Sequence, residues 1–352
     1  FLLSSDPIPD TGKERLCDDS RGVWLRTPRW DSDNTHGTGC TLSSAIASAL
    51  ALGEENRHCS DEEERVGAIS SIQIVDACCL AKAYVSAGIQ RGVQLGSGPG
   101  PVAQTDFPSS FENFPKIVTD PTVPRTRTPT DFFKLPAFRH EHPSSLGRTL
   151  PIVDTVEWVE HLSKTPGITD IQLRIKDETD PNKIAERVRL CQNFCKQSGV
   201  RLWINDHWRA ALEAGCFGVH LGQEDLFQCV QDGGLEQMKA KSVALGISTH
   251  SFGELAAALG VKPSYISMGP VFATSSKKVE FDPQGLQTVR KWRELIPPAV
   301  PFVTIGGIND VEAAYLNCWA GSDCIAVISA ITGSPNPTQS VAELNDAMTG
   351  LS

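Results

Sequence analysis

Two aspartates, Asp206 and Asp225, each follow a short apolar run of the length expected for a buried β-strand. The runs are LWI at 202–204 and FGVHL at 217–221, separated by about the length of one short helix. Parallel strands joined by such a crossover point their carboxyl ends the same way, so both carboxylates are expected at one rim of a sheet. Such a pair suits Mg²⁺, which commonly bridges carboxylates to a substrate phosphate. The alternative is that both residues start loops or cap helices.

The elements that would position these carboxylates begin near residue 150, where short apolar runs start to alternate with helical stretches. The predicted strands are 150–153, 170–174, 202–205, 218–221, 244–248, 265–268, 302–305 and 324–328. The predicted helices between them include 156–163, 182–197, 208–214, 252–259, 286–295 and 311–320. Eight strands in about 200 residues predict an α/β fold of the (β/α)₈ TIM-barrel type. A doubly wound open sheet is the alternative, but it normally has fewer strands and a glycine-rich first turn.

In a barrel of this type the functional groups lie at the carboxyl ends of the strands. The second predicted strand ends in Gln172, Arg174 and Lys176, which alternation places on one face, opposite Leu173 and Ile175. Two cations facing into a barrel mouth are unfavourable unless an anion neutralises them. This strand end therefore indicates an anionic ligand, and the alternative is that both cations are surface residues at a frayed strand end.

The other strand ends contribute amides, hydroxyls, glycines and a lysine. They carry Asn205, Ser248, Thr274, Ser275, Ser276, Lys277, Gly307, Ile328 and Ser329. Gly307 precedes a helix N-terminus, and the loops after strands 7 and 8 are the commonest phosphate site of such barrels. The rim thus predicts two anion sites, one for a Mg²⁺-diphosphate and one for a phosphate monoester. This pair of sites is typical of a transferase that joins a diphosphate ester to a phosphorylated acceptor.

The motifs QLRIK, IND, HLGQED, GISTH, T-x-S-K, IGGI and ISAIT, in this order between residues 149 and 352, resemble thiamine-phosphate synthase. The resemblance implies condensation of 4-amino-2-methyl-5-(diphosphomethyl)pyrimidine with 4-methyl-5-(2-phosphoethyl)thiazole to give thiamine phosphate and diphosphate. The implied course is a dissociative substitution through a pyrimidine carbocation, in which Mg²⁺ and the catalytic residues Arg174, Lys176 and Lys277 neutralise the leaving diphosphate. Ser276 departs from the usual threonine of the family but keeps a hydroxyl.

The resemblance also implies the ligand of each site residue. The pyrimidine diphosphate is assigned to Gln172, Leu173, Arg174, Ile175, Lys176, Asn205, Ser248 and Lys277. The thiazole phosphate is assigned to Thr274, Ser275, Ser276, Gly307, Ile328 and Ser329. Mg²⁺ is assigned to Asp206 and Asp225.

The front of the chain has a resemblance of its own. The stretch DNTHGTGCTLSSAIASALALG is similar to the C-terminal signature of hydroxymethylpyrimidine (phosphate) kinase, a ribokinase-like α/β family. By that resemblance Cys40 is the base, Gly37 to Gly39 line an anion hole, and ATP is the cofactor of this part alone. About 100 residues with few strands are little for a whole α/β domain. Residues 1–105 are therefore expected to be a C-terminal fragment, inactive unless the rest of a kinase lies upstream.

The elements expected in this front part are two helices and a linker. A helix is predicted at 41–52 with Gly53 as its C-cap, and a second helix is predicted from the acidic run at 61–64 to about residue 92. Residues 106–148 are rich in proline and predict a linker between the fragment and the barrel.

The composition of the 352-residue chain argues against some classes of binding partner. A net charge of −10 without a basic run argues against nucleic acid, and no run approaches the ~18 apolar residues of a membrane span. The 11 cysteines show no zinc or disulfide spacing, which favours reduced thiols in the cytoplasm or, in a photosynthetic eukaryote, a plastid. The chain starts with Phe1, so its natural start and any transit peptide are expected upstream. The expected partners are the two small-molecule substrates, and self-association into a homo-oligomer is left open.

Two other functions compete with synthesis. A thiazole tautomerase of the same barrel family binds thiazole phosphate but needs no Mg²⁺-diphosphate site, so Arg174, Lys176, Asp206, Asp225 and Lys277 argue against it. A non-catalytic sensor of thiamine phosphates would keep the binding residues, and only an assay separates it from an enzyme.

Overall fold

The computed structural model describes residues 24–58, 74–118, 146–274 and 282–350. The chain divides into two compact units. The first contains residues 1–131, 251–262 and 294–297, and the second contains residues 132–250, 263–293 and 298–352.

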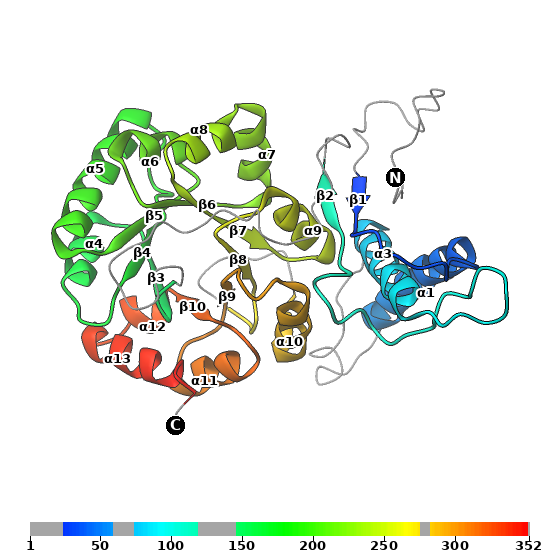
Figure 1. Ribbon diagram of the computed structural model, residues 1–352. Coiled ribbons are helices and arrows are strands. Elements are labelled where there is room, and N and C mark those ends of the chain that lie inside the picture. The colour runs from blue at the N-terminus through cyan, green and yellow to red at the C-terminus, as the bar shows by residue number, and fades with distance from the viewer. Residues whose placement is uncertain (1–23, 59–73, 119–145, 275–281, 351–352) are drawn as a thin grey trace. The chain divides into compact units, whose positions relative to one another are not determined.

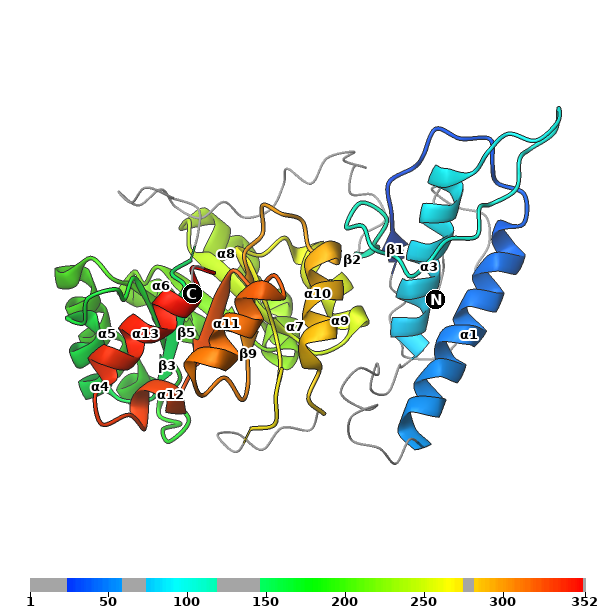
Figure 2. The same ribbon diagram turned by 90° about the horizontal axis from the view of Figure 1, so that it is seen from below.

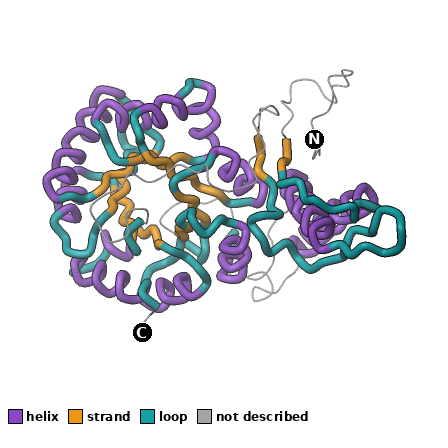
Figure 3. Tube along the Cα trace, viewed as in Figure 1, coloured by secondary structure: helices purple, strands orange, loops and turns teal. Residues whose placement is uncertain are grey.

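A closed barrel of eight parallel strands forms the centre of the second unit (Figures 1 and 3). Its strands are β3 (Thr149–Val153), β4 (Asp170–Leu173), β5 (Arg201–Asn205), β6 (Gly218–Leu221), β7 (Ala244–Thr249), β8 (Tyr265–Met268), β9 (Phe302–Ile305) and β10 (Cys324–Val327). Each strand pairs with its neighbour in chain order, and β10 closes the ring on β3 with Ile325 opposite Thr149. The predicted TIM-barrel fold is confirmed.

Helices alternate with the strands along the chain. They are α4 (Val156–Ser163), α5 (Pro181–Ser198), α6 (Trp208–Ala214), α7 (Gln223–Gln231), α8 (Gly234–Ala240), α9 (Phe252–Val261), α10 (Gly285–Leu295), α11 (Val311–Trp319), α12 (Ser329–Thr332) and α13 (Pro337–Ala347). Side-chain caps fix several of their starts, as where Asp180 accepts the N–H of Asn182 ahead of α5 and Asp310 accepts that of Ala313 in α11. Helices α4, α5, α6, α11 and α13 lie outside the ring of strands (Figure 1).

The barrel interior is filled by large rings that face glycines on neighbouring strands. A Cβ atom at Gly218 would collide with the Trp203 ring, and one at Gly246 would collide with the Tyr265 ring. The Trp203 and Tyr265 rings meet edge to face, with centroids 4.9 Å apart. Glycine is therefore needed at both positions because the opposing ring occupies the space of a side chain.

Asp170 is fully buried at the start of β4 and is satisfied by four donors. Its carboxylate accepts the backbone N–H of Gly147 at 2.9 Å, the Thr169 hydroxyl at 2.8 Å and the Trp203 indole N–H at 2.9 Å. It also forms an ion pair with buried Arg201. This network holds the chain segment that enters the barrel, and removal of either charge would leave the other buried without its partner.

The first unit has less regular structure in its described residues. Helices α1 (Thr38–His58) and α3 (Ile74–Arg91) lie side by side (Figure 2), and β1 (Trp24–Arg26) pairs antiparallel with β2 (Lys116–Val118). The Trp30 indole donates to the Ser86 hydroxyl at 2.9 Å and to the Asn113 amide oxygen at 3.1 Å.

Two expectations for this part differ from the structure. Helix α1 begins earlier than predicted and continues through Gly53, which is therefore not its C-cap. Glycine only lowers helix stability by about 1 kcal/mol, so it need not end a helix. Strand β2 lies within the range expected to be linker, because residues 116–118 find a partner strand in β1. The acidic run at 61–64 lies outside the described residues. Within the described chain, no helix has both the length and the apolar character to cross a lipid bilayer.

Candidate active site at the carboxyl ends of the barrel strands

Asp206 occupies a tight turn directly after β5. Its φ of 64° lies in the left-handed region, which aspartate adopts more readily than most residues. Its N–H donates to the carbonyl of His220 on β6 at 2.9 Å, and its own carbonyl accepts the N–H of Trp208 at 2.7 Å. These bonds fix the carboxylate at the rim, as the sequence predicted for this strand end.

Asp225 approaches Asp206 from the first turn of α7. The Asp206 carboxylate lies close enough to Asp225 to act on its charge. The pKa of Asp225 is raised above its ordinary value, first by partial loss of solvent and then by the negative charge of Asp206, while the Lys176 ammonium opposes the shift. Two carboxylates whose negative charges repel each other suit a cation, which removes their repulsion.

The donor set fits Mg²⁺ more closely than a transition metal. Both candidate ligands, Asp206 and Asp225, offer carboxylate oxygens, and Mg²⁺ is commonly bound by one or two carboxylates together with water and substrate phosphate oxygens. In the part of the chain that the structure describes, no cluster of three or more histidine, cysteine, aspartate or glutamate side chains could enclose a metal ion. Substrate oxygens and water would therefore complete the coordination of a cation at Asp206 and Asp225.

Lys176 supplies a positive charge beside the carboxylates. Its ammonium donates to Asp206 Oδ2 at 2.5 Å, and its side chain remains 53% exposed. Exposed ion pairs contribute little stability, so this contact can be exchanged for one with a ligand. Arg174 lies just past the end of β4, where its N–H donates to the Val153 carbonyl at 2.8 Å and its side chain is half-buried.

The remaining predicted residues at the end of β4 differ in what their side chains contact. Gln172 donates from its side-chain amide to Asn205 Oδ1 at 2.9 Å, which joins β4 to β5 beneath the rim. The side chains of Leu173 and Ile175 are buried in the core, so only their backbone groups could reach a ligand. The predicted alternation of polar and apolar side chains therefore continues beyond the strand itself.

Ser248 lies near the carboxyl end of β7 and belongs to a chain of contacts that the sequence did not reveal. Its hydroxyl is 2.8 Å from His220 Nε2, and His220 Nδ1 is 2.6 Å from the hydroxyl of Tyr265 on β8. Gln223 donates to the Ser248 carbonyl at 2.6 Å. The sequence signal for this chain of contacts was His220, which lies inside the four-residue strand β6, two positions before Gly222.

The expected phosphate-monoester site lies at the loops after β9 and β10. Gly306 and Gly307 have φ of 100° and 69°, and a Cβ atom at Gly307 would meet Phe272 and the Ala273 carbonyl. Glycine is required there because the backbone is both left-handed and closely packed.

Ser329 begins the short helix α12, with Ile328 at its N-cap. The Ser329 hydroxyl donates to Asn309 Oδ1 at 3.1 Å, and Asn309 was not predicted to belong to the site. Thr274 is the last described residue of the loop after β8, and Ser275, Ser276 and Lys277 lie outside the described residues.

Cys40 is exposed in the first turn of α1 in the first unit. Gly37 has a φ of 85°, and its carbonyl accepts the N–H of Thr41 at 2.9 Å. The glycine turn and helix start therefore form as the motif predicts. The sheet of this unit, in its described residues, consists of two strands of three residues each.

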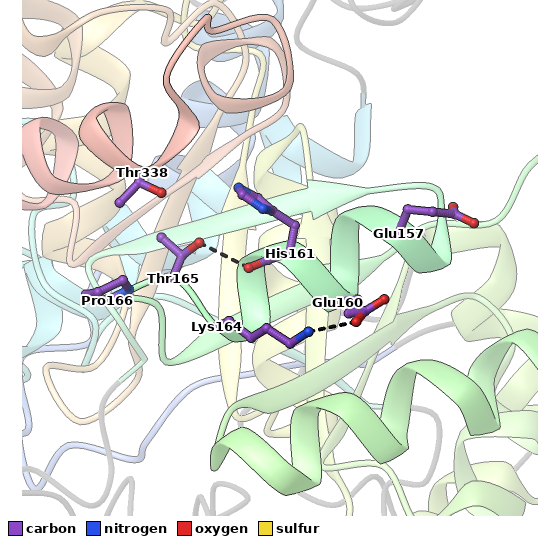
Figure 4. A pocket seen from close by; sticks show the side chains of 7 residues that line it. All are labelled: Glu157, Glu160, His161, Lys164, Thr165, Pro166 and Thr338. Atoms are coloured by element: carbon purple, nitrogen blue, oxygen red, sulfur yellow. Dashed lines mark hydrogen bonds and ion pairs between the residues drawn. The ribbon is translucent and has the colours of Figure 1, made fainter.

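A hollow of about 360 Å³ on the barrel lies away from the predicted residues. It is lined by residues of α4, the following turn and α13. Lys164 pairs with Glu160 one helical turn earlier at 2.7 Å, and Figure 4 shows this pair along α4. None of its lining residues is one of the predicted site residues.

Comparisons with known proteins match the barrel and the front of the chain to two different families. The family model described as thiamine monophosphate synthase matches residues 148–331, and the model described as phosphomethylpyrimidine kinase matches residues 7–62. The thiamine-phosphate synthase of Rhizobium etli is 40% identical over 186 residues, which cover 53% of this chain and 87% of that protein. That of Serratia proteamaculans is 40% identical over 209 residues, covering 59% and 94%. The solved thiamine phosphate pyrophosphorylase from Pyrococcus furiosus is 26% identical, with a TM-score of 0.49 and coverage of 58% and 98%.

Proposed function

The chain belongs to the thiamine monophosphate synthase family and is a transferase that forms thiamine phosphate, and we propose that the rim residues described above carry out this reaction. The proposed substrates are 4-amino-2-methyl-5-(diphosphomethyl)pyrimidine and 4-methyl-5-(2-phosphoethyl)thiazole. The products are thiamine phosphate and diphosphate.

The electrostatic coupling of Asp206 to Asp225 at one rim carries this proposal. Two carboxylates held together beside the Lys176 ammonium form a site for a cation and the oxygens of a diphosphate. A tautomerase that binds only thiazole phosphate has no leaving diphosphate and needs no such site. The geometry therefore favours synthesis over tautomerisation.

In the proposed reaction, the bond between the methylene carbon and the diphosphate oxygen breaks, and its electron pair leaves with the diphosphate. The thiazole nitrogen then donates its lone pair to the methylene carbon, so a C–N bond replaces the C–O bond without a protein nucleophile. Arg174 and Lys176 bind the diphosphate and neutralise the charge that develops on it. Mg²⁺, when bound by Asp206 and Asp225, would supply further neutralisation of that group. Lys277 is proposed to act with them.

The second substrate is proposed to be held by its phosphate at Gly307, Ile328 and Ser329, with Thr274, Ser275 and Ser276 beside them. Backbone N–H groups near glycine and at a helix start favour a phosphate. Anchoring the phosphate would orient the thiazole nitrogen toward the methylene carbon, and such positioning lowers the barrier by reducing the entropy lost in the reaction.

The first unit is proposed to contribute no phosphorylation by itself. The kinase model matches a short stretch of the chain, and the described sheet of this unit has two short strands. We assign residues 1–105 to a kinase fragment, 106–148 to a connection that includes β2, and 149–352 to the synthase barrel. Incubation of the chain with ATP and hydroxymethylpyrimidine or its phosphate should give no phosphorylated product, and measurable turnover would contradict this assignment.

The synthase proposal is tested by incubating the full chain with both substrates and Mg²⁺ and measuring thiamine phosphate and diphosphate. We expect equal amounts of both products, and none when either substrate is omitted. A chain that binds thiamine phosphate but forms no product would instead be a sensor. A chain that alters thiazole phosphate without the pyrimidine would be a tautomerase.

A further inference from the structure

A line of three side chains crosses strands β8, β6 and β7 inside the barrel. Tyr265 and His220 are buried, with exposed fractions of 0% and 7%, whereas Ser248 at the end of the line is only partly buried. The Tyr265 hydroxyl lies 2.6 Å from His220 Nδ1, and His220 Nε2 lies 2.8 Å from the Ser248 hydroxyl oxygen. The Tyr265 and His220 rings are also stacked, with centroids 5.6 Å apart and planes 18° from parallel.

The direction of these hydrogen bonds follows from the buried phenol. Among the described residues, the polar partner of the Tyr265 hydroxyl is His220 Nδ1. Burial raises the pKa of Tyr265 well above its ordinary value, so the phenol keeps its proton. A buried O–H without an acceptor is unfavourable, and the phenol therefore donates to Nδ1. The neutral imidazole then carries its own proton on Nε2 and donates it to Ser248.

The consequence for Ser248 is that one lone pair of its oxygen is already occupied. Its own proton has Ser267 Oγ as a neighbour at 3.5 Å, a distance at the outer limit of a hydrogen bond, and Ser267 has a second neighbour in the Ile247 carbonyl at 3.4 Å. The Ser248 backbone is held by Gln223 at 2.6 Å. The hydroxyl proton can therefore turn toward the barrel mouth.

We propose that Tyr265 and His220 are positioning residues that make Ser248 a hydrogen-bond donor to the pyrimidine substrate. The proposal rests on the synthase function proposed above, in which Ser248 contacts the pyrimidine diphosphate. Its partner on the substrate would be an acceptor atom, the class to which ring nitrogens and phosphate oxygens belong. Without the fixed imidazole, the Ser248 hydroxyl could rotate and present a lone pair to that acceptor, which is repulsive.

The tautomer of His220 can be measured without any activity. The full chain is labelled with ¹⁵N-histidine, and a two-bond ¹H–¹⁵N correlation spectrum is recorded in the absence of substrates, with the His220→Gln variant used to assign the signals. We expect a neutral ring with its proton on Nε2. A proton on Nδ1 would overturn the proposal whether or not the chain makes thiamine phosphate.

A kinetic experiment compares Tyr265→Phe, Ser248→Ala and the double variant, with Tyr315→Phe on α11 as a matched control. Each single variant should lower kcat/KM for the pyrimidine diphosphate about fivefold, which corresponds to about 1 kcal/mol. The double variant should be no worse than Ser248→Ala, and KM for the thiazole phosphate should not change. Multiplied losses would mean that Tyr265 acts by structure alone and would overturn the proposal.

A conservative substitution guards against variants that fail to fold. The side-chain amide of His220→Gln can place a donor near the former Nε2, whereas His220→Ala cannot. We expect the glutamine variant to keep several-fold more activity than the alanine variant. Equal losses in the two folded variants would contradict the positioning role.

Discussion

In the barrel, the residues of the candidate site come from strand ends far apart in the sequence, whereas those of the first unit come from one continuous stretch. Asp206 and Asp225 meet only because β5 and β6 are neighbours in a closed sheet of eight strands. Gly37 to Cys40 need only a glycine turn and the start of α1. A local motif can thus form without a substrate site around it, while a long-range constellation requires its whole scaffold. For this reason the barrel motifs indicate activity and the front motif indicates ancestry.

The largest expected effect concerns the carboxylate pair. Asp206→Ala or Asp225→Ala should lower synthase kcat by about 10²–10³-fold, the range seen when a group that stabilises transition-state charge is removed. EDTA should act as strongly on the unaltered chain. The matched control is Asp232→Asn at the other end of α7, where the carboxylate pairs with Arg209, and it should keep full activity. Full activity of both alanine variants would place the metal elsewhere.

The second prediction uses thiol reactivity to compare the two units. Cys40 is exposed, whereas burial raises the pKa of Cys191, Cys195 and Cys216 to about 12. Alkylation at mildly alkaline pH should therefore modify Cys40 at least about a hundredfold faster than these three thiols, because the thiolate is the reactive form. Peptide mass spectrometry measures the rates, and denatured protein, in which all should react, is the control. Rapid labelling of the three barrel thiols in the native chain would show that the core is open.

The third prediction concerns the cation beside the carboxylates. Lys176→Met should lower kcat/KM for the pyrimidine diphosphate roughly 10- to 100-fold, since hydrogen bonds to charged groups contribute about 1.5–3 kcal/mol. Its control is Lys164→Met on the outer hollow, where the lysine pairs with Glu160. Steady-state kinetics with each substrate varied in turn would show whether the loss is confined to the pyrimidine. Equal losses for Lys176→Met and Lys164→Met would argue that neither lysine binds substrate.

The smallest expected effect is on stability and has opposite signs with and without metal. The raised pKa of Asp225 means that the folded chain holds this proton more tightly than the unfolded chain. Its contribution to stability is therefore present at low pH and is lost as the pH rises through the folded-state pKa. At neutral pH without Mg²⁺, Asp225→Asn should melt at the same or a slightly higher temperature than the unaltered chain.

Mg²⁺ should reverse that order, because a ligand that binds only the folded state stabilises it. The melting temperature of the unaltered chain should rise by a few degrees, while that of Asp225→Asn should not. Below about pH 4, where carboxyl groups become protonated, the two proteins should melt alike. Destabilisation by Asp225→Asn at neutral pH without metal would contradict the repulsion between the two carboxylates.

The sequence predicts most of the barrel because buried parallel strands are continuous apolar runs. Each of the eight predicted strands differs from the observed one by at most one residue at either end. The rim residues followed from the same strands, since function lies where strands end. Helices α7, α8, α12 and α13 were not among the predicted helices, and the shortest of them carry few positions on which apolar periodicity can show.

The sequence alone does not show which residues of neighbouring strands lie opposite each other. The contact of His220 with Tyr265 joins residues 45 positions apart, and only the pairing of β6, β7 and β8 brings them together. The same holds for Gln172 and Asn205, whose amide contact depends on Gln172 lying opposite Trp203. Strand β2 of the first unit was not predicted, because a strand of three residues forms only where a partner strand is present to pair with it.

The most direct test of the central claim is calorimetric titration of inorganic diphosphate into the full chain, with and without Mg²⁺. The barrel rim as described should bind diphosphate tightly only when Mg²⁺ is present, and Asp206→Ala should abolish that difference. Equal affinity in EDTA, or an undiminished Mg²⁺ effect in Asp206→Ala, would show that the carboxylate pair does not bind the metal that accompanies the leaving group.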